Sequence, residues 1–395
     1  MAKSIVFCAD GTWNGPGQGE EQEADGGRRT NVYKLFLNLD GTLAAGTGTL
    51  LTADEQEKVL AGPDGRVTQI AKYLHGVGDS RNFLVRMLGG GGGAGLVTRV
   101  VRGYTFISRN FEPGDRIFIV GFSRGAYTAR ALAGLIAARG LLDDKQNDLS
   151  DRDQAYRLGS AEWFTYRRGA LRSKPNLLHR LAEVSVDLPR FLSSEATAAR
   201  IPDVTVEAVV VWDTVGALGI PAYNLKTDTQ LDAFQFADLI LSEKVRHGLH
   251  AVSIDEQRAN FTPTLWDAEP RITQVLFPGA HADVGGGYPD RESGLSDCAL
   301  QWVTKQMTAL GVAFAARPTV ALEPDPCGKS HTPWADAPWN ILPRGSRQIR
   351  GGLAVHRSVA DRLAGVAKLP APYKPSNLTD YLDGTQLKTS VTIAD

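Results

Sequence analysis

Short runs of apolar and β-branched residues recur along the chain, and each is typical of a buried strand. These runs lie at residues 4–9, 68–76, 116–120, 204–212 and 272–277. Segments rich in helix-forming residues separate them, at residues 30–39, 96–110, 126–138, 228–251 and 295–310. Strands that alternate with helices in this way form a mostly parallel sheet flanked by helices. The pattern therefore predicts the α/β class.

The junction between the third strand and the third helix has the sequence G-F-S-R-G, a G-x-S-x-G motif centred on Ser123. Strand, sharp turn and helix are the context of a nucleophile elbow, which holds the serine in a strained backbone conformation. Side chains at Gly121 and Gly125 would collide with the neighbouring strand and helix. The helix N-terminus can also stabilise an oxyanion. We therefore predict that Ser123 is a nucleophile; the alternative is a plain glycine-rich turn.

A nucleophile elbow requires an acid and then a histidine further along the chain, each just after a strand. Asp213 and His281 both follow predicted strands, the latter in a glycine-rich loop. The order serine, aspartate, histidine is that of the α/β-hydrolases. His281 would take the serine proton and return it to the leaving group, while Asp213 orients the imidazole and Ser123 forms an acyl-enzyme. Asp283 is a second candidate for the acid or a support for the loop, but its place two residues from His281 favours Asp213.

The first predicted strand ends in a polar turn, D-G-T-W-N. Ligands bind at such carboxyl ends of strands in open α/β sheets. The backbone N–H of Gly11 or Thr12 would supply half of an oxyanion hole, and that of Arg124 the other half. Equally, Asp10 would only cap the turn. A phosphatase of the D-x-D-G-T type is a weak alternative, because Cys8 stands where its nucleophilic aspartate is expected.

The proposed chemistry requires no metal and no cofactor. His247 and His250 are three residues apart on the helix predicted at 228–251, and a metal pair is conceivable. With no third ligand in reach, a structural role is favoured. The five glycines at 89–93 lack the G-K-[ST] ending of a phosphate-binding loop. We therefore expect neither a metal site nor a cofactor site.

The predicted elements divide the chain into a core and two additions. Residues 1–140 and 203–316 would form the α/β-hydrolase core. Residues 141–202 fall between two core strands, where hydrolases insert a cap or lid. The aromatic residues of that segment would pack the cap onto the core, which is favoured, or line an acyl pocket. Residues 317–395 are richer in proline and would form a small C-terminal appendage, while residues 41–65 have the composition of an irregular insert.

Composition narrows the function further. The 395 residues are 43% hydrophobic, ample for a large core, and carry a formal net charge of -1 without a basic stripe, which argues against nucleic-acid binding. The three cysteines are scattered and suggest no disulfide framework. The N-terminus is too short in apolar residues for a signal peptide, and no apolar run approaches the roughly 20 residues of a membrane span. We expect a cytoplasmic protein, or one exported without a cleavable signal peptide.

Several stretches together resemble a known family of α/β-hydrolases. They are F-C-A-D-G-T-W-N, T-N-V, G-V-G-D, G-F-S-R-G-A-Y-T-A-R, V-W-D-T-V-G-A-L-G, S-I-D-E-Q-R-A-N-F and F-P-G-A-H-A-D-V-G-G-G-Y, spread over roughly residues 4–310. The family includes the Tle1-type phospholipase effectors of the bacterial type VI secretion system. The resemblance implies a triad, which its motifs place on Ser123, Asp213 and His281. It also implies phospholipase A activity for characterised members.

The sequence therefore predicts a serine hydrolase that cleaves carboxylic esters, with acyl chains of phospholipids or similar lipids as the leading substrate class. A soluble small-molecule esterase and a catalytically silent, hydrolase-like binding module are the alternatives. The expected partners are a lipid or ester substrate, a membrane surface in peripheral contact, and an immunity or secretion protein.

Overall fold

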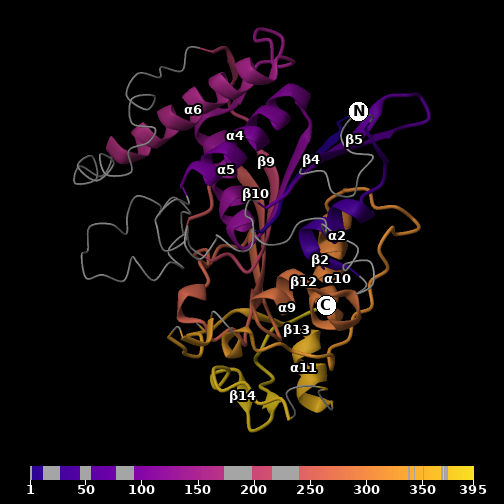
Figure 1. The fold of residues 1–395 in the computed structure, drawn as a ribbon, viewed down its shortest axis with the longest axis vertical. Coiled ribbons are helices and arrows are strands. Elements are labelled where there is room, and N and C mark those ends of the chain that lie inside the picture. The colour runs from indigo at the N-terminus through magenta and orange to yellow at the C-terminus, as the bar shows by residue number, and fades with distance from the viewer. Residues whose placement is uncertain are drawn as a thin grey trace.

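The fold is built on one large sheet. The computed structural model describes residues 2–11, 27–44, 55–76, 93–172, 198–215, 240–336, 339–341, 343–349, 351–365, 368 and 372–395. The strands of the sheet are β1 (Ser4–Ala9), β3 (Thr42–Leu43), β4 (Glu55–Ala61), β5 (Val67–Leu74), β6 (Arg116–Phe122), β9 (Val206–Trp212), β10 (Val245–Ser253), β11 (Ile272–Phe277), β13 (Ala354–His356) and β16 (Ile393–Ala394). Their order is β16-β13-β11-β10-β9-β6-β1-β5-β4-β3 (Figure 1). Every neighbouring pair from β16 to β5 is parallel, and β4 and β3 are antiparallel additions at one edge. All five predicted strands are confirmed, and so is the α/β class.

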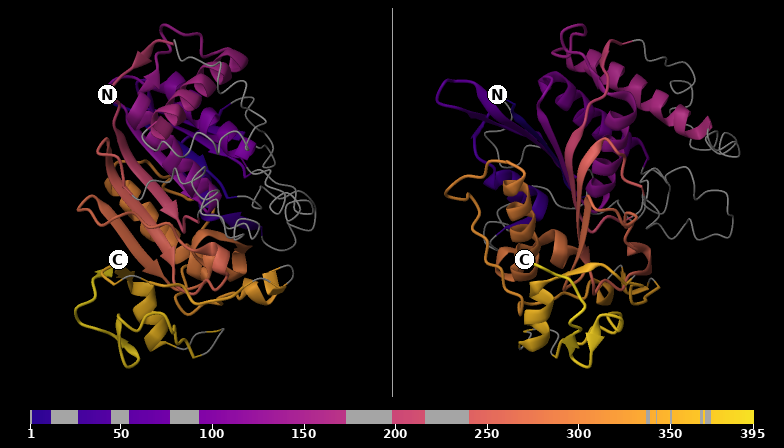
Figure 2. Two further views of the ribbon diagram at one scale, coloured as in Figure 1. Left: turned by 90° about the vertical axis from the view of Figure 1, so that its left-hand side faces the viewer. Right: turned by 180° about the vertical axis from the view of Figure 1, so that it is seen from behind.

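Helices cover both faces of this sheet (Figure 2). They are α2 (Asn31–Asn38), α4 (Gly93–Asn110), α5 (Arg124–Arg139), α6 (Arg152–Arg172), α9 (His281–Gly285), α10 (Gly294–Ala309) and α11 (Arg357–Ala364). Side chains alternate between the faces along β1: Phe7 packs among residues of α4 and α5, whereas Val6 and Cys8 pack among residues of α2 and α10. The helices predicted at 30–39, 96–110, 126–138 and 295–310 are therefore confirmed. Among the helices of the described ranges, none has the length and apolarity that a membrane crossing requires.

The helix predicted at 228–251 is wrong over its last part. Residues 245–253 form β10, which pairs in register with β9 and β11. Two neighbouring strands supply its hydrogen bonds, so tertiary context outweighs the helical composition of this segment. His247 and His250 therefore lie on a strand and face opposite sides of the sheet, which removes the geometry expected of a metal pair. Residues 228–239 lie outside the described part of the chain.

The insert at 41–65 is more regular than expected, because it contains β3 and β4. The sequence did not predict β4 because two of its inward-facing positions are polar. These residues, Gln56 and Lys58, are both buried, so the strand lacks the usual alternation of apolar and polar positions. The Lys58 ammonium donates to the carbonyl oxygens of Leu37 and Leu39 at 2.6 and 2.9 Å, which satisfies it inside the protein. Buried polar groups with such partners are tolerated in a core.

The segment between α5 and β9 packs closely on the core in its described part. A short pair of strands, β7 (Leu141–Leu142) and β8 (Arg200–Ile201), ties its two ends together. Trp163 and Phe164 on α6 are 1% and 8% exposed and belong to the same apolar cluster as α4 and α5. These aromatic side chains pack the segment onto the core, which is the role favoured for them.

The C-terminal segment continues the main sheet. Strands β13 and β16 extend it beyond β11, and α11 packs beside them. Their apolar side chains form a cluster with the end of β10, including Val252, Ile254, Val355 and Val359. In Figure 1 this yellow part lies directly below the carboxyl ends of the central strands. The domain boundaries at residues 140, 203 and 316 stay predictions.

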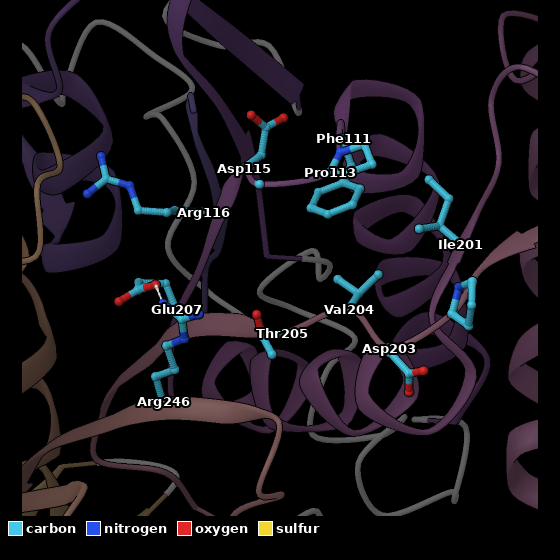
Figure 3. A pocket seen from close by; sticks show the side chains of 12 residues that line it. Phe111, Pro113, Asp115, Arg116, Ile201, Asp203, Val204, Thr205, Glu207 and Arg246 are labelled. Atoms are coloured by element: carbon cyan, nitrogen blue, oxygen red, sulfur yellow. Dashed lines mark hydrogen bonds and ion pairs between the residues drawn. The ribbon is translucent and has the colours of Figure 1, made fainter. Parts of the chain in front are cut away.

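A cavity of about 220 Å³ lies at the amino ends of β6 and β9 (Figure 3). Because Ser123 follows the carboxyl end of β6, this cavity is at the opposite edge of the sheet. Its charged side chains have partners: Arg246 donates to Glu207 at 3.1 Å, and Asp115 pairs with Lys3. It therefore has no part in the site described next.

Candidate active site

Ser123 lies between the end of β6 and the start of α5 in a conformation that few residues other than glycine adopt. Its φ and ψ are 57° and −120°, which is a strained combination for a side chain with a Cβ. The Ser123 N–H donates to the carbonyl oxygen of Trp212 at 3.2 Å, which fixes the turn to the end of β9. The strained turn that the G-x-S-x-G motif predicts is therefore present.

The two glycines of the motif are required by close backbone packing. A Cβ at Gly121 would lie 2.3 Å from the carbonyl oxygen of Gly125, at the start of the following helix. A Cβ at Gly125 would lie 2.1 Å from the carbonyl oxygen of Ala9 on β1. Both distances are far below van der Waals contact. The elbow thus packs directly on its own helix and on the neighbouring strand, as predicted.

Asp213 and His281 meet at the same edge of the sheet. Asp213 directly follows β9 with a φ of 38°, and His281 is the first residue of α9, which follows β11. His281 Nδ1 is 2.5 Å from Asp213 Oδ2, and both residues are buried. His281 is therefore held in a short helix and not in the loose loop that was expected. The pairing itself is the one predicted from the order of the motifs.

The histidine and the serine turn are in direct contact through Phe122, the residue before Ser123. The Phe122 ring lies 4.6 Å from the His281 ring, centroid to centroid, and Phe261 contacts the imidazole from another side at 5.0 Å. A Cβ at Gly285, on α9, would lie 2.0 Å from the Phe122 ring. The elbow and the histidine helix therefore pack as one unit, with no space between them for a side chain.

Asp213 has a second partner that sequence reasoning missed. Arg347, 6% exposed, donates from Nη1 to Asp213 Oδ1 at 2.6 Å and from Nη2 to Oδ2 at 2.8 Å. The N–H of Ser253 also donates to Oδ1 at 3.0 Å. Burial opposes the negative charge of Asp213, but Arg347 and His281 outweigh it and hold the pKa of the carboxyl well below its usual range. No motif or spacing in the sequence marks Arg347.

A second ion pair lies on the backbone side of His281. The N–H of His281 donates to Glu256 Oε2 at 3.2 Å, and Arg258 binds the same carboxylate at 2.8 Å while its guanidinium lies 3.6 Å from the Phe261 ring centroid. Burial lowers the pKa of His281 below its ordinary value, although the hydrogen bond and charge of Asp213 act in the opposite direction. This shift favours the neutral form of the imidazole, which is the form that a general base needs.

Asp283 takes the other role that was considered for it, which is to hold the histidine loop. Its Oδ2 accepts from the N–H groups of Ala280 and His331, both at 2.9 Å, and its Oδ1 lies 2.6 Å from His331 Nδ1. The carboxylate thus caps the start of α9 and links it to the C-terminal segment. Asp213, not Asp283, is the acid bonded to His281.

Asp10 caps the turn after β1. Its buried carboxylate accepts from the Gly11 N–H at 2.6 Å and from the hydroxyl groups of Thr30 and Tyr73, both at 2.7 Å. Burial raises the pKa of Asp10 to about 6. The Gly11 N–H is therefore occupied in this structure, and Gly11 would have to release Asp10 before it could donate to an oxyanion. Thr12 lies outside the described residues.

Arg124 is the first residue of α5, where backbone N–H groups have no acceptor within the helix. This places its N–H directly beside Ser123. Burial, together with the charge of Arg99, lowers the pKa of the Arg124 side chain to about 9. The role of the Arg124 N–H as an oxyanion donor stays a prediction.

His250 supports the turn that carries Asp213. Its Nε2 accepts from the Thr214 N–H at 3.1 Å, and its Nδ1 lies 3.3 Å from Gln274 Oε1. Burial lowers its pKa to about 3, so the ring is neutral. The structural role favoured for this histidine is therefore confirmed. The described residues also contain no cluster of three or more side chains suited to a metal ion.

Comparison with known proteins identifies the family. Residues 3–306 match the family model for the catalytic domain of Tle1-like phospholipase effectors of the type VI secretion system. The chain belongs to this family. The Tle1-like match extends over the elbow, Asp213 and His281, and it ends before Arg347.

The Tle1-like chain is also similar to a curated yeast protein and to two solved structures. It is 29% identical over 281 residues to the uncharacterized protein YEL023C of Saccharomyces cerevisiae, covering 69% of this chain and 34% of that protein. An uncharacterized protein from Pseudomonas aeruginosa is 16% identical, with a TM-score of 0.37, covering 79% of this chain and 46% of that one. The Tle1 effector bound to the VgrG spike of the type VI secretion system is 17% identical, with a TM-score of 0.36, covering 73% and 51%. The chain thus spans about a third of the yeast protein and about half of each solved chain.

Proposed function

We propose that this Tle1-like chain is a serine ester hydrolase of the phospholipase A type. The observation that carries the proposal is the contact of 2.5 Å between His281 Nδ1 and Asp213 Oδ2, together with a strained Ser123 on the turn whose Phe122 ring packs against the imidazole. A neutral, buried histidine oriented by a carboxylate next to an elbow serine is suited to acyl transfer. Membership of a phospholipase effector family supports a lipid substrate.

The reaction would proceed in two steps. His281 Nε2 accepts the proton of Ser123 Oγ as that oxygen bonds to the ester carbonyl carbon, and the carbonyl electron pair moves to its oxygen. The Arg124 N–H stabilises this oxyanion, with Thr12 or a released Gly11 as the second donor. The carbon–oxygen bond to the alcohol then breaks, His281 returns the proton to the alcohol, and an acyl-enzyme remains. Water activated by His281 releases the fatty acid and regenerates Ser123.

The partners and location follow from the family alone. We propose that the protein is exported through type VI secretion, with a spike protein such as VgrG as a secretion partner and an immunity protein in cells that make it. A membrane surface would be met peripherally. No cofactor is used in the steps above.

Fatty-acid release from phospholipid vesicles tests the proposal, with short p-nitrophenyl esters in parallel. Ser123→Ala should lose about a thousandfold or more of the activity and all labelling by a fluorophosphonate. The matched control is Ser150→Ala, an exposed serine at the start of the α6 segment, which should behave as wild type. Activity on short esters alone would replace the lipase with a soluble esterase. No activity and no labelling would leave a silent binding module.

A further inference from the structure

Both terminal nitrogens of Arg347 are engaged twice. Beyond its two bonds to Asp213, Nη1 donates to the carbonyl oxygen of Ser253 at 2.7 Å and Nη2 donates to that of Phe261 at 2.6 Å. One guanidinium therefore joins Asp213 after β9, Ser253 at the end of β10, and the segment of Phe261, whose ring contacts the His281 imidazole. Planar guanidinium groups fix carboxylate orientation in a way that a lysine cannot, because both oxygens are held at once.

The two carboxylates nearest to His281 are both paired with arginines, and one of these arginines is Arg347. The carboxylates that face the imidazole and its surroundings are Asp213 and Glu256, with Asp255 next to Glu256 in the chain and Asp283 two residues after His281 on α9. Arg347 pairs with Asp213, and Arg258 pairs with Glu256. Each of the two nearest negative charges is thus matched by a buried arginine. Asp283 is itself paired with His331.

Pairing of these carboxylates with arginines acts in the same direction as burial, which is the main cause of the lowered pKa of His281. An imidazole beside an unpaired carboxylate is stabilised as the cation, which would leave the base protonated and inactive over a wider range of pH. With both carboxylates paired to arginines, the imidazolium cation gains less from them than it would from unpaired carboxylates. Because Arg347 Nη2 and His281 Nδ1 lie against the same oxygen of Asp213, the arginine acts on the imidazole at short range.

We propose that Arg347 is a positioning residue of the hydrolase: it fixes Asp213 so that Oδ2 faces His281, and its charge keeps the imidazole unprotonated before the substrate arrives. The inference rests on the proposed function. It also extends the site beyond the matched catalytic domain, because Arg347 comes from the C-terminal segment after residue 306. That segment is therefore required to complete the active site.

The test compares Arg347→Gln and Arg347→Lys with wild type through the pH dependence of kcat/KM on a short ester. In Arg347→Gln the low-pH side of the profile, where activity is lost as the base becomes protonated, should move to higher pH by about one to two pH units, the size of shift that removal of a nearby charge produces. Arg347→Lys keeps the positive charge but cannot bind both oxygens of Asp213 at once. The low-pH side of its profile (the acid limb) should therefore stay in place, while kcat falls about ten- to a hundredfold. Arg344→Gln, exposed and three residues away, is the matched control and should change neither.

A second readout separates this inference from the proposed function. The pKa of His281 is measured by NMR titration of its ring in wild type and in both variants, which needs no turnover. Wild type that is neither active nor labelled at Ser123 would end the hydrolase proposal, while a higher pKa of His281 in Arg347→Gln would still support the charge effect.

An unchanged acid limb or an unchanged pKa of His281 in Arg347→Gln would overturn the charge effect. Full kcat in Arg347→Lys would overturn the positioning role. If Arg347→Gln does not fold, Arg347→Lys alone decides: a wild-type kcat and pH profile together would reject the inference, and a reduced kcat with an unmoved acid limb would support it.

Discussion

Replacement of Gly125 by alanine tests how tightly the elbow is fixed. The added Cβ would lie 2.1 Å from the Ala9 carbonyl oxygen, 2.6 Å from the Asp10 carbonyl oxygen and 2.8 Å from the Ala9 carbonyl carbon. All three atoms belong to the backbone, so no side chain can rotate away. Strand β1 is hydrogen-bonded on both sides, to β5 and β6, and cannot shift at low cost.

The expected magnitude follows from these contacts. Overpacking in a core costs typically about 1–3 kcal/mol, and a rigid backbone obstacle places Gly125→Ala at the upper end. The gain of about 1 kcal/mol in helix propensity offsets only part of this. We expect a net loss of about 2 kcal/mol of unfolding free energy. Activity should fall about a hundredfold, because a displaced β1 or elbow moves Ser123 relative to His281.

Two further glycines calibrate the measurement. At Gly103 the new Cβ would meet the ends of Leu132 and Phe7 side chains at 2.7 Å, which can adjust, so the loss should be smaller. At Gly345 nothing lies within 4 Å and φ is not positive, so alanine there should change stability by less than about 0.5 kcal/mol. Urea unfolding followed by tryptophan fluorescence gives the free energies, and fluorophosphonate labelling gives the state of Ser123. A Gly125→Ala protein as stable and as reactive as Gly345→Ala would refute the reasoning.

Two other predictions concern stability. Burial of His331 disfavours its cation, but hydrogen bonds to Asp283 and Glu292 outweigh burial and raise its pKa. The contribution of protonated His331 to the free energy of unfolding is therefore complete below about pH 6.5, the unfolded pKa. It is lost as the pH rises through the raised pKa of the folded state. The stability difference between wild type and His331→Gln in urea should therefore be larger at pH 6 than at pH 9, and an equal difference would contradict the assignment. Trp163→Ala should cost about 3–5 kcal/mol because the side chain is fully packed, yet leave the preference among ester chain lengths unchanged. A changed chain-length preference would show that Trp163 lines the acyl site.

The local part of the site was predictable because its signals are local. The strand at β6, the helix at α5 and the turn between them are encoded within about 25 consecutive residues, and the glycines are required by contacts that the motif itself implies. The pairing of Asp213 with His281 followed from topology, since carboxyl ends of parallel strands meet at one edge. Whether the first turn supplies an oxyanion donor at Gly11 or is only capped by Asp10 could not be decided, because both alternatives rest on the same five residues, D-G-T-W-N. The catalytic roles themselves stay predictions.

Strand β10 shows where this reasoning fails. Its residues include His247, Gly248 and His250, none of which favours a strand by itself, and the preceding residues have helical composition. This segment is a strand because it pairs with β9 and β11, and neither of these strands is adjacent to it in the sequence. Pairing partners of this kind leave no mark on the segment itself.

Arg347 is the extreme case of the same limitation. It lies 134 residues from Asp213 in the sequence, in a proline-containing stretch with no regular pattern, yet it holds both oxygens of that carboxylate. A motif search finds residues that react, because their chemistry fixes their local context. Residues that adjust the charge of the reacting groups need only lie close to them in the fold, and they can come from any segment of the chain. If His281 is the catalytic base, its charge state is therefore a property of the whole fold, because the arginine that holds its partner Asp213 lies beyond residues 3–306, which match the family's catalytic domain.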